Sequence, residues 1–278
     1  MEDKLRVNYY WQWEWPEHGK WQMLEPKHWE WVHDDSLPLD CYIDRGIYKF
    51  KNNNKKKIFI ALESDGHYKD VHEFVKNNWN LFDYIFTFDL ELLKLPNARR
   101  SIFGGIWYVS DIKPDQKTKQ ISFCCSNKTI VPSHLERLKL ADTIHNKVDM
   151  KGNYYGEYAN TKEIYEDYKF SIVFECERTP YYFTEKLLNA FTNRCIPINY
   201  GCTNLESFGF DINGIIQVTS IDEIVELINS DFNWDEFYNR SEVRTAIEHN
   251  FNQAFKYSRF EDFILETYPD IFNKLNSD

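Results

Sequence analysis

The chain has 278 residues, of which 42% are hydrophobic and 17% aromatic, so it is long enough to bury the cores of two domains. Its 33 basic and 44 acidic residues give a formal net charge of −11, and basic residues cluster only in the short stretch 51–57. An acidic chain without a basic stripe does not attract phosphate-rich surfaces. We therefore expect neither nucleic acid nor an anionic membrane as a partner.

Targeting and metal-binding signals are absent from the sequence. No apolar run approaches about 18 residues, and no basic-then-apolar segment stands at the N-terminus, so we expect a soluble, cytoplasmic protein with no membrane span. The six cysteines show no CxxC spacing and are expected to be reduced. The sequence has no HExxH and no Asp-x-Asp pair, so we expect no catalytic metal and no cofactor. It also lacks GxxxxGK[ST], GxGxxG and GxSxG, which argues against a P-loop enzyme, a dinucleotide dehydrogenase and a serine hydrolase.

The N-terminal stretch holds six of the nine tryptophans within its first 31 residues. Period-two spacing places Trp11, Trp13 and Trp15 on one face of a strand. Exposed tryptophans stack on sugar rings, whereas aromatic stripes more often belong to a core. We favour the core interpretation, in which these residues cover the sheet of the first domain. A carbohydrate platform is the alternative.

Strands and helices then alternate along the chain. Strands are predicted at residues 58–62, 83–88 and 103–109, with a helix at about 67–78. In the second half, strands are predicted at residues 121–125 and 215–218. Three helices are predicted to begin at a polar cap that is followed three residues later by a glutamate, at Ser133, Asn160 and Ser220. A helical, aromatic-rich tail begins near Trp234.

Residues 113–119 contain no apolar side chain and separate two α/β halves. This arrangement predicts two Rossmann-like domains that face each other across a cleft. We place the first domain at residues 1–116 and the second at residues 117–278, with the C-terminal helices in the second.

The most informative segment is 168–201, which holds a strand, a charged turn, a helix and a second strand. The apolar run 170–174 is typical of a buried strand. Thr184 is predicted to cap the following helix, whose first turn carries Glu185 and Lys186. An anion placed there meets a cation and the helix dipole together. This segment therefore predicts a pocket for a phosphate-bearing ligand.

Three short motifs in this segment carry a family resemblance. FE at 174–175, YxTEK at 182–186 and IPIxxG at 196–201 resemble, in this order, the donor-site motif of the α1,3/α1,4-fucosyltransferases, glycosyltransferase family ten. ISFCCSNK at 121–128 and NLFDYIFTFD at 80–89 resemble further segments of the family. The resemblance implies the GT-B fold, GDP-fucose as the donor substrate and an oligosaccharide or other glycan as the acceptor.

Transfer from a GDP-sugar needs cations that stabilise the departing diphosphate. Lys186 lies at a helix start, and Arg137 lies at a position that resembles the phosphate-binding arginine of the family. A guanidinium can bind two oxygens, and an ammonium supplies a compact charge. We predict that both bind the donor. An ordinary surface role is the alternative for each.

Polar groups must also orient the ribose and the sugar. Glu185 is predicted to accept hydrogen bonds from their hydroxyls, with stabilisation of the helix dipole as the alternative. Tyr182 resembles the aromatic residue of the family motif and is predicted to cover the guanine or the sugar. Glu175 ends a strand and either serves the donor site or caps a loop.

The reaction also needs a base that takes the proton of the acceptor hydroxyl. An apolar strand runs into Glu63 and Asp65, and strand carboxyl ends line the cleft in open α/β sheets. Glu63, whose position resembles the acidic residue of the family's acceptor domain, is the predicted catalytic base. Asp65 is the second candidate for the base. The alternative for Glu63 is that it is an ordinary solvated acid in a loop. The sequence offers one base and no paired nucleophile, so we expect a single displacement that inverts the configuration at the anomeric carbon of the sugar.

Two departures from the family motif concern the donor sugar. Cys176 stands where the family commonly carries asparagine, and a thiol is a poor donor and acceptor of hydrogen bonds. Residues 199–200 are Asn-Tyr where relatives often carry Tyr-Trp. A transferase that uses another GDP-sugar and a glycan-binding protein that has lost turnover are therefore alternatives. Cys176 is not expected to be a nucleophile, because the sequence pairs it with no activating histidine.

Overall fold

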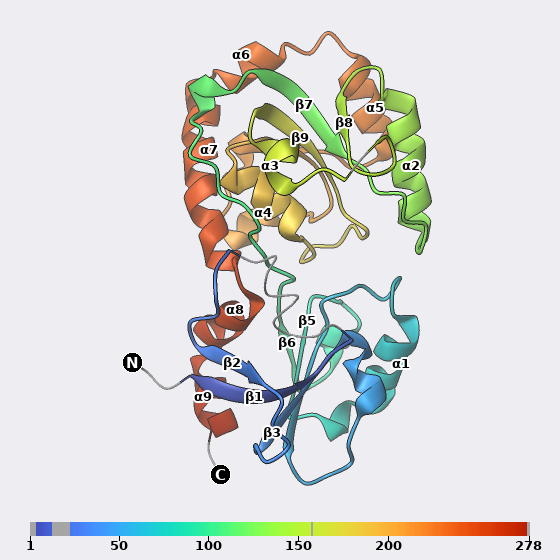
Figure 1. The fold of residues 1–278 in the computed structure, drawn as a ribbon, viewed down its shortest axis with the longest axis vertical. Coiled ribbons are helices and arrows are strands. Elements are labelled where there is room, and N and C mark those ends of the chain that lie inside the picture. Colours follow the sequence, from blue (N-terminus) through green and yellow to red (C-terminus); the bar gives the residue numbers. More distant parts are fainter. Residues whose placement is uncertain (1–3, 13–22, 157, 277–278) are drawn as a thin grey trace. The chain divides into compact units, whose positions relative to one another are not determined.

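The structure is a computed structural model that describes residues 4–12, 23–156 and 158–276. The chain divides into two compact units (Figure 1), the first formed by Met1–Gly105 with Arg259–Asp278 and the second by Ile106–Ser258. This division differs from the predicted one in two respects. The first unit ends at Gly105 rather than at residue 116, and the C-terminal segment, which we had assigned to the second domain, belongs to the first.

The first unit is built on a six-stranded sheet in the order β2-β1-β3-β4-β5-β6. All neighbouring strands pair in parallel, so the sheet needs cover on both faces. The strands are β1 (Leu5–Tyr10), β2 (Trp29–Val32), β3 (Leu39–Ile43), β4 (Lys56–Ile60), β5 (Tyr84–Thr87) and β6 (Ala98–Arg100). The predictions for β4 and β5 are confirmed, whereas β1, β2, β3 and β6 were not predicted as elements.

Helices cover the two faces of this sheet. On one face, α1 (Lys69–Asn77) packs Val71 against a buried cluster that includes Phe59. The C-terminal helices are α8 (Phe260–Thr267) and α9 (Pro269–Asn276). In α8, Glu261 accepts a hydrogen bond of 2.9 Å from Trp31 Nε1. Short 3-10 turns complete the unit at η2 (Asp44–Lys49), η3 (Trp79–Leu81) and η4 (Leu92–Lys94).

The described tryptophans of the N-terminal stretch are core residues. Trp11, Trp29 and Trp31 are buried. The core interpretation is therefore confirmed for these three, and a carbohydrate platform is not formed by them. Trp13, Trp15 and Trp21 lie outside the described residues.

The strand predicted at 103–109 is wrong. Gly104 and Gly105 take the left-handed φ values of 73° and 107°, which interrupt an extended chain. The backbone N–H groups of residues 107 and 108 both donate to Asn189 Oδ1, at 2.9 and 3.2 Å. A side chain thus satisfies backbone donors that a neighbouring strand would otherwise have bound.

The second unit is built on a five-stranded parallel sheet in the order β11-β10-β9-β7-β8. Its strands are β7 (Lys119–Cys124), β8 (Asp149–Lys151), β9 (Tyr168–Phe174), β10 (Ile196–Tyr200) and β11 (Ile216–Gln217). The helices are α2 (Pro132–Ile144), α3 (Thr161–Tyr165), α4 (Glu185–Thr192), α5 (Ile221–Asn229), α6 (Trp234–Tyr238) and α7 (Ser241–Ala254). The remaining 3-10 turns are η5 (Pro114–Gln116), η6 (Leu205–Phe208), η7 (Ile212–Gly214) and η8 (Phe255–Tyr257).

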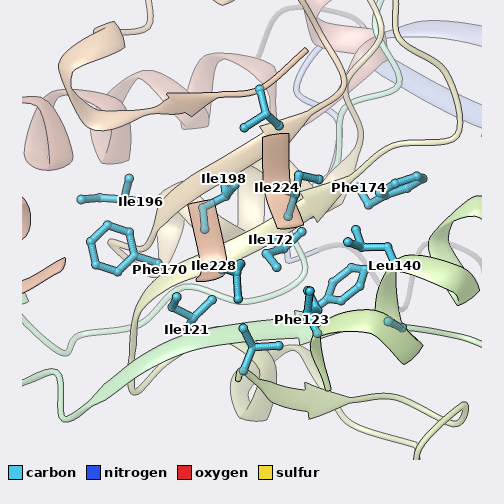
Figure 2. Close-up of a cluster of buried hydrophobic side chains, with 14 of the residues drawn as sticks. Ile121, Phe123, Leu140, Phe170, Ile172, Phe174, Ile196, Ile198, Ile224 and Ile228 are labelled. Carbon is cyan, nitrogen blue, oxygen red and sulfur yellow. The ribbon is translucent and has the colours of Figure 1, made fainter. Parts of the chain in front are cut away.

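The core of the second unit lies between one face of this sheet and the helices α2 and α5. Figure 2 shows that alternate residues of the three central strands project toward these helices, as the two-residue period of a strand requires. The helices contribute Leu140, Ile224 and Ile228. The strands contribute Ile121, Phe123, Phe170, Ile172, Phe174, Ile196 and Ile198.

The helix starts were predicted in part. Asn160 and Ser220 accept hydrogen bonds from the backbone N–H of Glu163 (3.0 Å) and Glu223 (3.1 Å), as predicted. The cap at Ser133 is wrong, because α2 begins at Pro132, whose fixed φ suits the first helical position. Among the described residues, no helix is long and apolar enough to cross a membrane.

Gly46 tests the packing of the first sheet. A Cβ at this position would lie 1.8 Å from the carbonyl oxygen of Tyr10, at the end of β1. We expect Gly46→Ala to lower the free energy of unfolding by about 1–3 kcal/mol, because backbone must move. Gly156→Ala is the control, since its Cβ would meet nothing within 4 Å, and it should change stability by less than about 0.5 kcal/mol. Equal denaturation midpoints for the two variants would contradict this packing.

Candidate active site

The topology of the second sheet indicates where a ligand binds. After β7 the chain adds β8 on one side, and it then adds β9, β10 and β11 on the other side of β7. Open parallel sheets bind ligands at the carboxyl ends of the strands where the order reverses in this way. The segments that follow β7 and β9 therefore form the candidate site of the second unit.

Arg137 is a buried cation at the end of β7. Its side chain projects from α2, and only 5% of the residue is exposed. Nη2 donates to the carbonyl oxygen and to Oγ of Ser126, at 3.1 and 2.9 Å. Within the part of the chain that the structure describes, no carboxylate pairs with Arg137, and its buried Nε has no hydrogen-bond partner. Since buried charges are normally paired, Arg137 is a candidate residue for binding an anionic ligand.

Glu175, at the end of β9, fastens the loop that leads into α4. Its carboxylate is buried and accepts hydrogen bonds from both Thr184 N and Thr184 Oγ1, each at 2.8 Å. Lys186 Nζ donates to the same carboxylate at 3.1 Å. Thr184 also caps α4, as predicted, by accepting from Lys186 N. The described contacts of Glu175 are those of a residue that closes a loop and holds a lysine.

The glycine of the IPIxxG motif makes room for this carboxylate. A Cβ on Gly201 would lie 2.6 Å from Cγ of Glu175. The backbone N–H of Glu175 donates to the carbonyl oxygen of Tyr200, which joins the ends of β9 and β10. The FE and IPIxxG motifs are therefore parts of one local packing arrangement.

Lys186 differs from Arg137 because it already has acidic partners. Nζ lies 3.1 Å from Glu175 Oε2 and 3.6 Å from Glu185 Oε1, and a third of the side chain is exposed. Burial opposes its charge, but attraction to Glu175 and Glu185 prevails and holds the pKa of Lys186 well above its ordinary value. Lys186 is therefore cationic at neutral pH.

The two cations lie around the same end of β7. Burial raises the pKa of the Cys124 thiol to about 11, and the charges of both Lys186 and Arg137 act on this thiol in the opposite direction. Both side chains therefore lie close enough to influence one thiol. The structure thus brings together the two residues that we predicted to bind a diphosphate.

Cys176 has a histidine partner that the sequence did not reveal. Its Sγ lies 3.3 Å from Nε2 of the buried His134, in α2. The backbone N–H of Ile130 donates to His134 Nδ1 at 3.1 Å, so the neutral imidazole carries its proton on Nε2. His134 therefore donates to Cys176 instead of removing its proton. Our reason for excluding a Cys176 nucleophile, the lack of a histidine, is corrected, but this tautomer does not activate the thiol.

The other two predicted donor-binding residues, Glu185 and Tyr182, belong to the YxTEK motif. Glu185 is in the first turn of α4, and its side chain is 14% exposed. Tyr182 is buried, with 2% of its surface exposed. Their roles toward a ribose, a sugar or a base stay predictions.

Glu63, the predicted base, belongs to the first unit and follows β4 by three residues. About a third of its side chain is exposed, and Oε2 lies 3.7 Å from Nδ1 of His67. Its backbone N–H donates to Asp44 Oδ1 at 3.2 Å, and its carbonyl oxygen lies 3.2 Å from Nε2 of His72. Asp65, the second candidate, is partly buried in the same loop.

The fold and the family follow from comparison with known proteins. A solved α1,3-fucosyltransferase bound to GDP-fucose is similar to this chain with a TM-score of 0.57 and 16% identity, covering 99% of this chain and 91% of that chain. A structure of a GtfA/B complex is similar with a TM-score of 0.52 and 13% identity, covering 86% and 58%. The fold is therefore that of the GT-B glycosyltransferases, as predicted. Among curated proteins, none matches the sequence.

The family model described as "Glycosyltransferase family 10 (fucosyltransferase) C-term" matches residues 114–255. This match covers more than half of the chain and includes the whole candidate site of the second unit. The chain therefore belongs to glycosyltransferase family 10, the fucosyltransferases. The family resemblance of the FE, YxTEK and IPIxxG motifs is confirmed.

The two cations should respond oppositely to removal of their charge. We expect Arg137→Met to leave the free energy of unfolding unchanged or to raise it slightly, because the variant no longer buries an unpaired charge and Ser126 is accessible to water. Lys186→Met should lower it by roughly 1–3 kcal/mol, because Glu175 would lose its cation. Urea denaturation of both variants without ligand measures the difference. A larger loss for Arg137→Met would show that Arg137 has a structural role.

Proposed function

We propose that this protein is an inverting fucosyltransferase that transfers fucose from GDP-fucose to a hydroxyl group of a glycan. Membership of glycosyltransferase family 10 supports the reaction class. Similarity to an α1,3-fucosyltransferase solved with GDP-fucose supports the donor. The observation that carries the proposal is the buried guanidinium of Arg137, which lacks a described acidic partner at the switch point of the sheet.

The diphosphate of the donor is the anion that suits Arg137. Two phosphate oxygens fit the planar N–H groups of a guanidinium, and the unsatisfied Nε provides one of the donors. Lys186 would add a compact charge from the first turn of α4, where the helix dipole also favours an anion. Its attraction to Glu175 and Glu185 keeps it charged but makes it the weaker anchor. We propose that Glu175 acts through Lys186 and the loop rather than on the donor itself.

The remaining donor-site residues would orient the other parts of GDP-fucose. Glu185 can accept hydrogen bonds from the hydroxyls of the ribose or the fucose. The predicted role of Tyr182 next to the guanine or the sugar would require its buried ring to become exposed. These protein groups supply the charge and the orientation that the reaction needs, so the proposed mechanism uses neither a metal nor a cofactor.

The chemical step would be a single displacement. The carboxylate of Glu63 takes the proton from the acceptor hydroxyl as its oxygen bonds to the anomeric carbon of fucose. The bond from that carbon to the β-phosphate oxygen breaks, and GDP leaves with the electron pair, stabilised by Arg137 and Lys186. One displacement inverts the anomeric configuration. The proposal requires the two units to present Glu63 and the bound donor to the same hydroxyl.

The two alternatives from the sequence differ in their support. Use of another GDP-sugar is an alternative because Cys176 and residues 199–200 depart from the family motif. A glycan-binding protein without turnover loses the support of Trp11, Trp29 and Trp31, because these three tryptophans are buried. Transfer assays with GDP-fucose and GDP-mannose, alongside glycan binding, separate the three.

Arg137 is the direct test of donor binding. We expect Arg137→Met to weaken GDP binding by about 10- to 100-fold, because charge-assisted hydrogen bonds to phosphate are lost. Lys139→Met is the matched control, since Lys139 is an exposed residue of the same helix, and it should bind GDP like the unmodified protein. Calorimetric titration gives both affinities. Equal affinities in the two variants would exclude Arg137 from the donor site.

Glu63 is the direct test of catalysis. We expect Glu63→Gln to lower kcat for fucose transfer by about 10²- to 10⁴-fold, because the amide cannot accept the proton. GDP affinity should not change, since Glu63 lies in the other unit. Asp65→Asn is the control and should retain most activity. If Asp65→Asn removes transfer and Glu63→Gln does not, the base assignment moves to Asp65.

A further inference from the structure

The sheet of the first unit has its own switch point. β1 lies between β2 and β3, so the strand order reverses there, as it does beside β7 in the second unit. Asp44 follows β3 directly, and Gly46 in the same turn packs against the carbonyl oxygen of Tyr10 at the end of β1. Asp44 therefore lies at the position where open parallel sheets place functional groups.

The backbone at Asp44 is specialised. Its φ is 47°, in the left-handed region that residues other than glycine, asparagine and aspartate seldom adopt. The residue is also buried, with 2% of its surface exposed. A buried acid in a costly conformation indicates that the surrounding structure holds it for a specific contact.

The contact is with the loop that carries Glu63. Asp44 Oδ1 accepts hydrogen bonds from the backbone N–H of Leu62 at 2.9 Å and of Glu63 at 3.2 Å. One carboxylate oxygen after β3 thus binds two successive amides after β4. On the other side of the residue, His72 Nε2 lies 3.2 Å from the Glu63 carbonyl oxygen. The backbone of Glu63 is therefore held from both sides, while its side chain stays partly exposed.

We propose that Asp44 is a positioning residue that fixes the backbone of Glu63, so that the Glu63 carboxylate points at the acceptor hydroxyl. This inference rests on the proposed role of Glu63 as the base. Asp44 does not itself touch the substrate, because its carboxylate is buried and directed at the two amides. Nothing in the local sequence signals this role, since the two residues are 19 positions apart.

The protonation state of Asp44 affects how negative charge is shared between Asp44 and Glu63. Burial and the neighbouring charge of Glu63 raise the pKa of Asp44 to about 8, although the N–H groups of Leu62 and Glu63 oppose this shift. In the described part of the chain, Tyr68 also interacts with Asp44 and Glu63, and its ring lies under the Arg45 guanidinium at 4.4 Å, while His67 lies beside the Glu63 carboxylate. At neutral pH a protonated Asp44 would leave the negative charge of the pair to Glu63.

Two substitutions separate the hydrogen bonds from the backbone conformation. Asp44→Gly keeps the left-handed conformation but removes the acceptor, whereas Asp44→Asn tolerates that conformation and keeps an acceptor oxygen. We expect Asp44→Gly to lower kcat for fucose transfer by about 10- to 100-fold, with the KM for GDP-fucose unchanged. We expect Asp44→Asn to restore kcat to within about threefold of the unmodified protein.

Amide hydrogen exchange provides a readout that does not depend on activity. Exchange at Leu62 and Glu63 should be faster in Asp44→Gly and unchanged in Asp44→Asn. Unchanged exchange in Asp44→Gly, or kcat equal to that of the unmodified protein, would overturn the positioning role. If exchange and kcat respond as expected but Glu63→Gln is fully active, the contact is real and the base assignment is the part that fails.

A pH titration of stability tests the charge of Asp44. Between its ordinary value near 3.8 and its folded value of about 8, the folded protein keeps a proton that the unfolded chain has released. The contribution of Asp44 to stability therefore falls as pH rises through this window. Asp44→Asn has no such proton and should lose less stability between pH 5 and about 8. Parallel pH curves for the two proteins would contradict a protonated Asp44.

Discussion

The buried guanidinium of Arg137 sets the chemistry of the second unit. A cation at this depth is costly unless an anion accompanies it, and the described residues provide none for Arg137. Lys186, close by, has two carboxylates within 4 Å and is therefore satisfied without a ligand. Arg137 is thus a buried cation without a described acidic partner, whereas the charge of Lys186 is already balanced by carboxylates of the protein. Under the proposed function, a diphosphate that binds both groups would stabilise the folded second unit.

The two units use the same device to hold their functional loops. In each, a buried carboxyl group follows a strand and accepts at least one backbone N–H hydrogen bond from a loop, which is its own loop for Glu175 and the loop after β4 for Asp44. Glu175 binds Thr184 N at the start of α4, and Asp44 binds Glu63 N after β4. Glycines allow both contacts, since Gly201 leaves room for Glu175 and Gly46 packs the turn that follows Asp44. Rigid placement of this kind favours transition-state stabilisation, because little reorganisation is then needed when the substrate binds.

The sequence predicted features that are local, and it missed features that depend on distant partners. The strand-helix-strand segment at 168–201 was recognisable because its apolar runs, its cap at Thr184 and its motifs are contiguous. β3 was missed because a buried acid, Asp40, interrupts the apolar pattern of the strand. The hydrogen-bond partners of Asp40 come from other segments, as when Asn8 Nδ2 donates to Asp40 Oδ1 at 2.8 Å. The contact between Cys176 and His134 spans 42 positions, so no spacing rule could find it. The strand at 103–109 was wrong because Asn189 binds its amides.

The central claim is that the second unit binds the diphosphate of a GDP-sugar. Calorimetric titration of the unmodified protein with GDP, GDP-fucose, GDP-mannose and UDP-glucose tests it most directly. We predict that GDP and GDP-fucose bind and that UDP-glucose does not. Preferential binding of GDP-mannose would keep the pocket but change the sugar. Failure of all four nucleotides to bind would contradict the role of Arg137 and the proposed function.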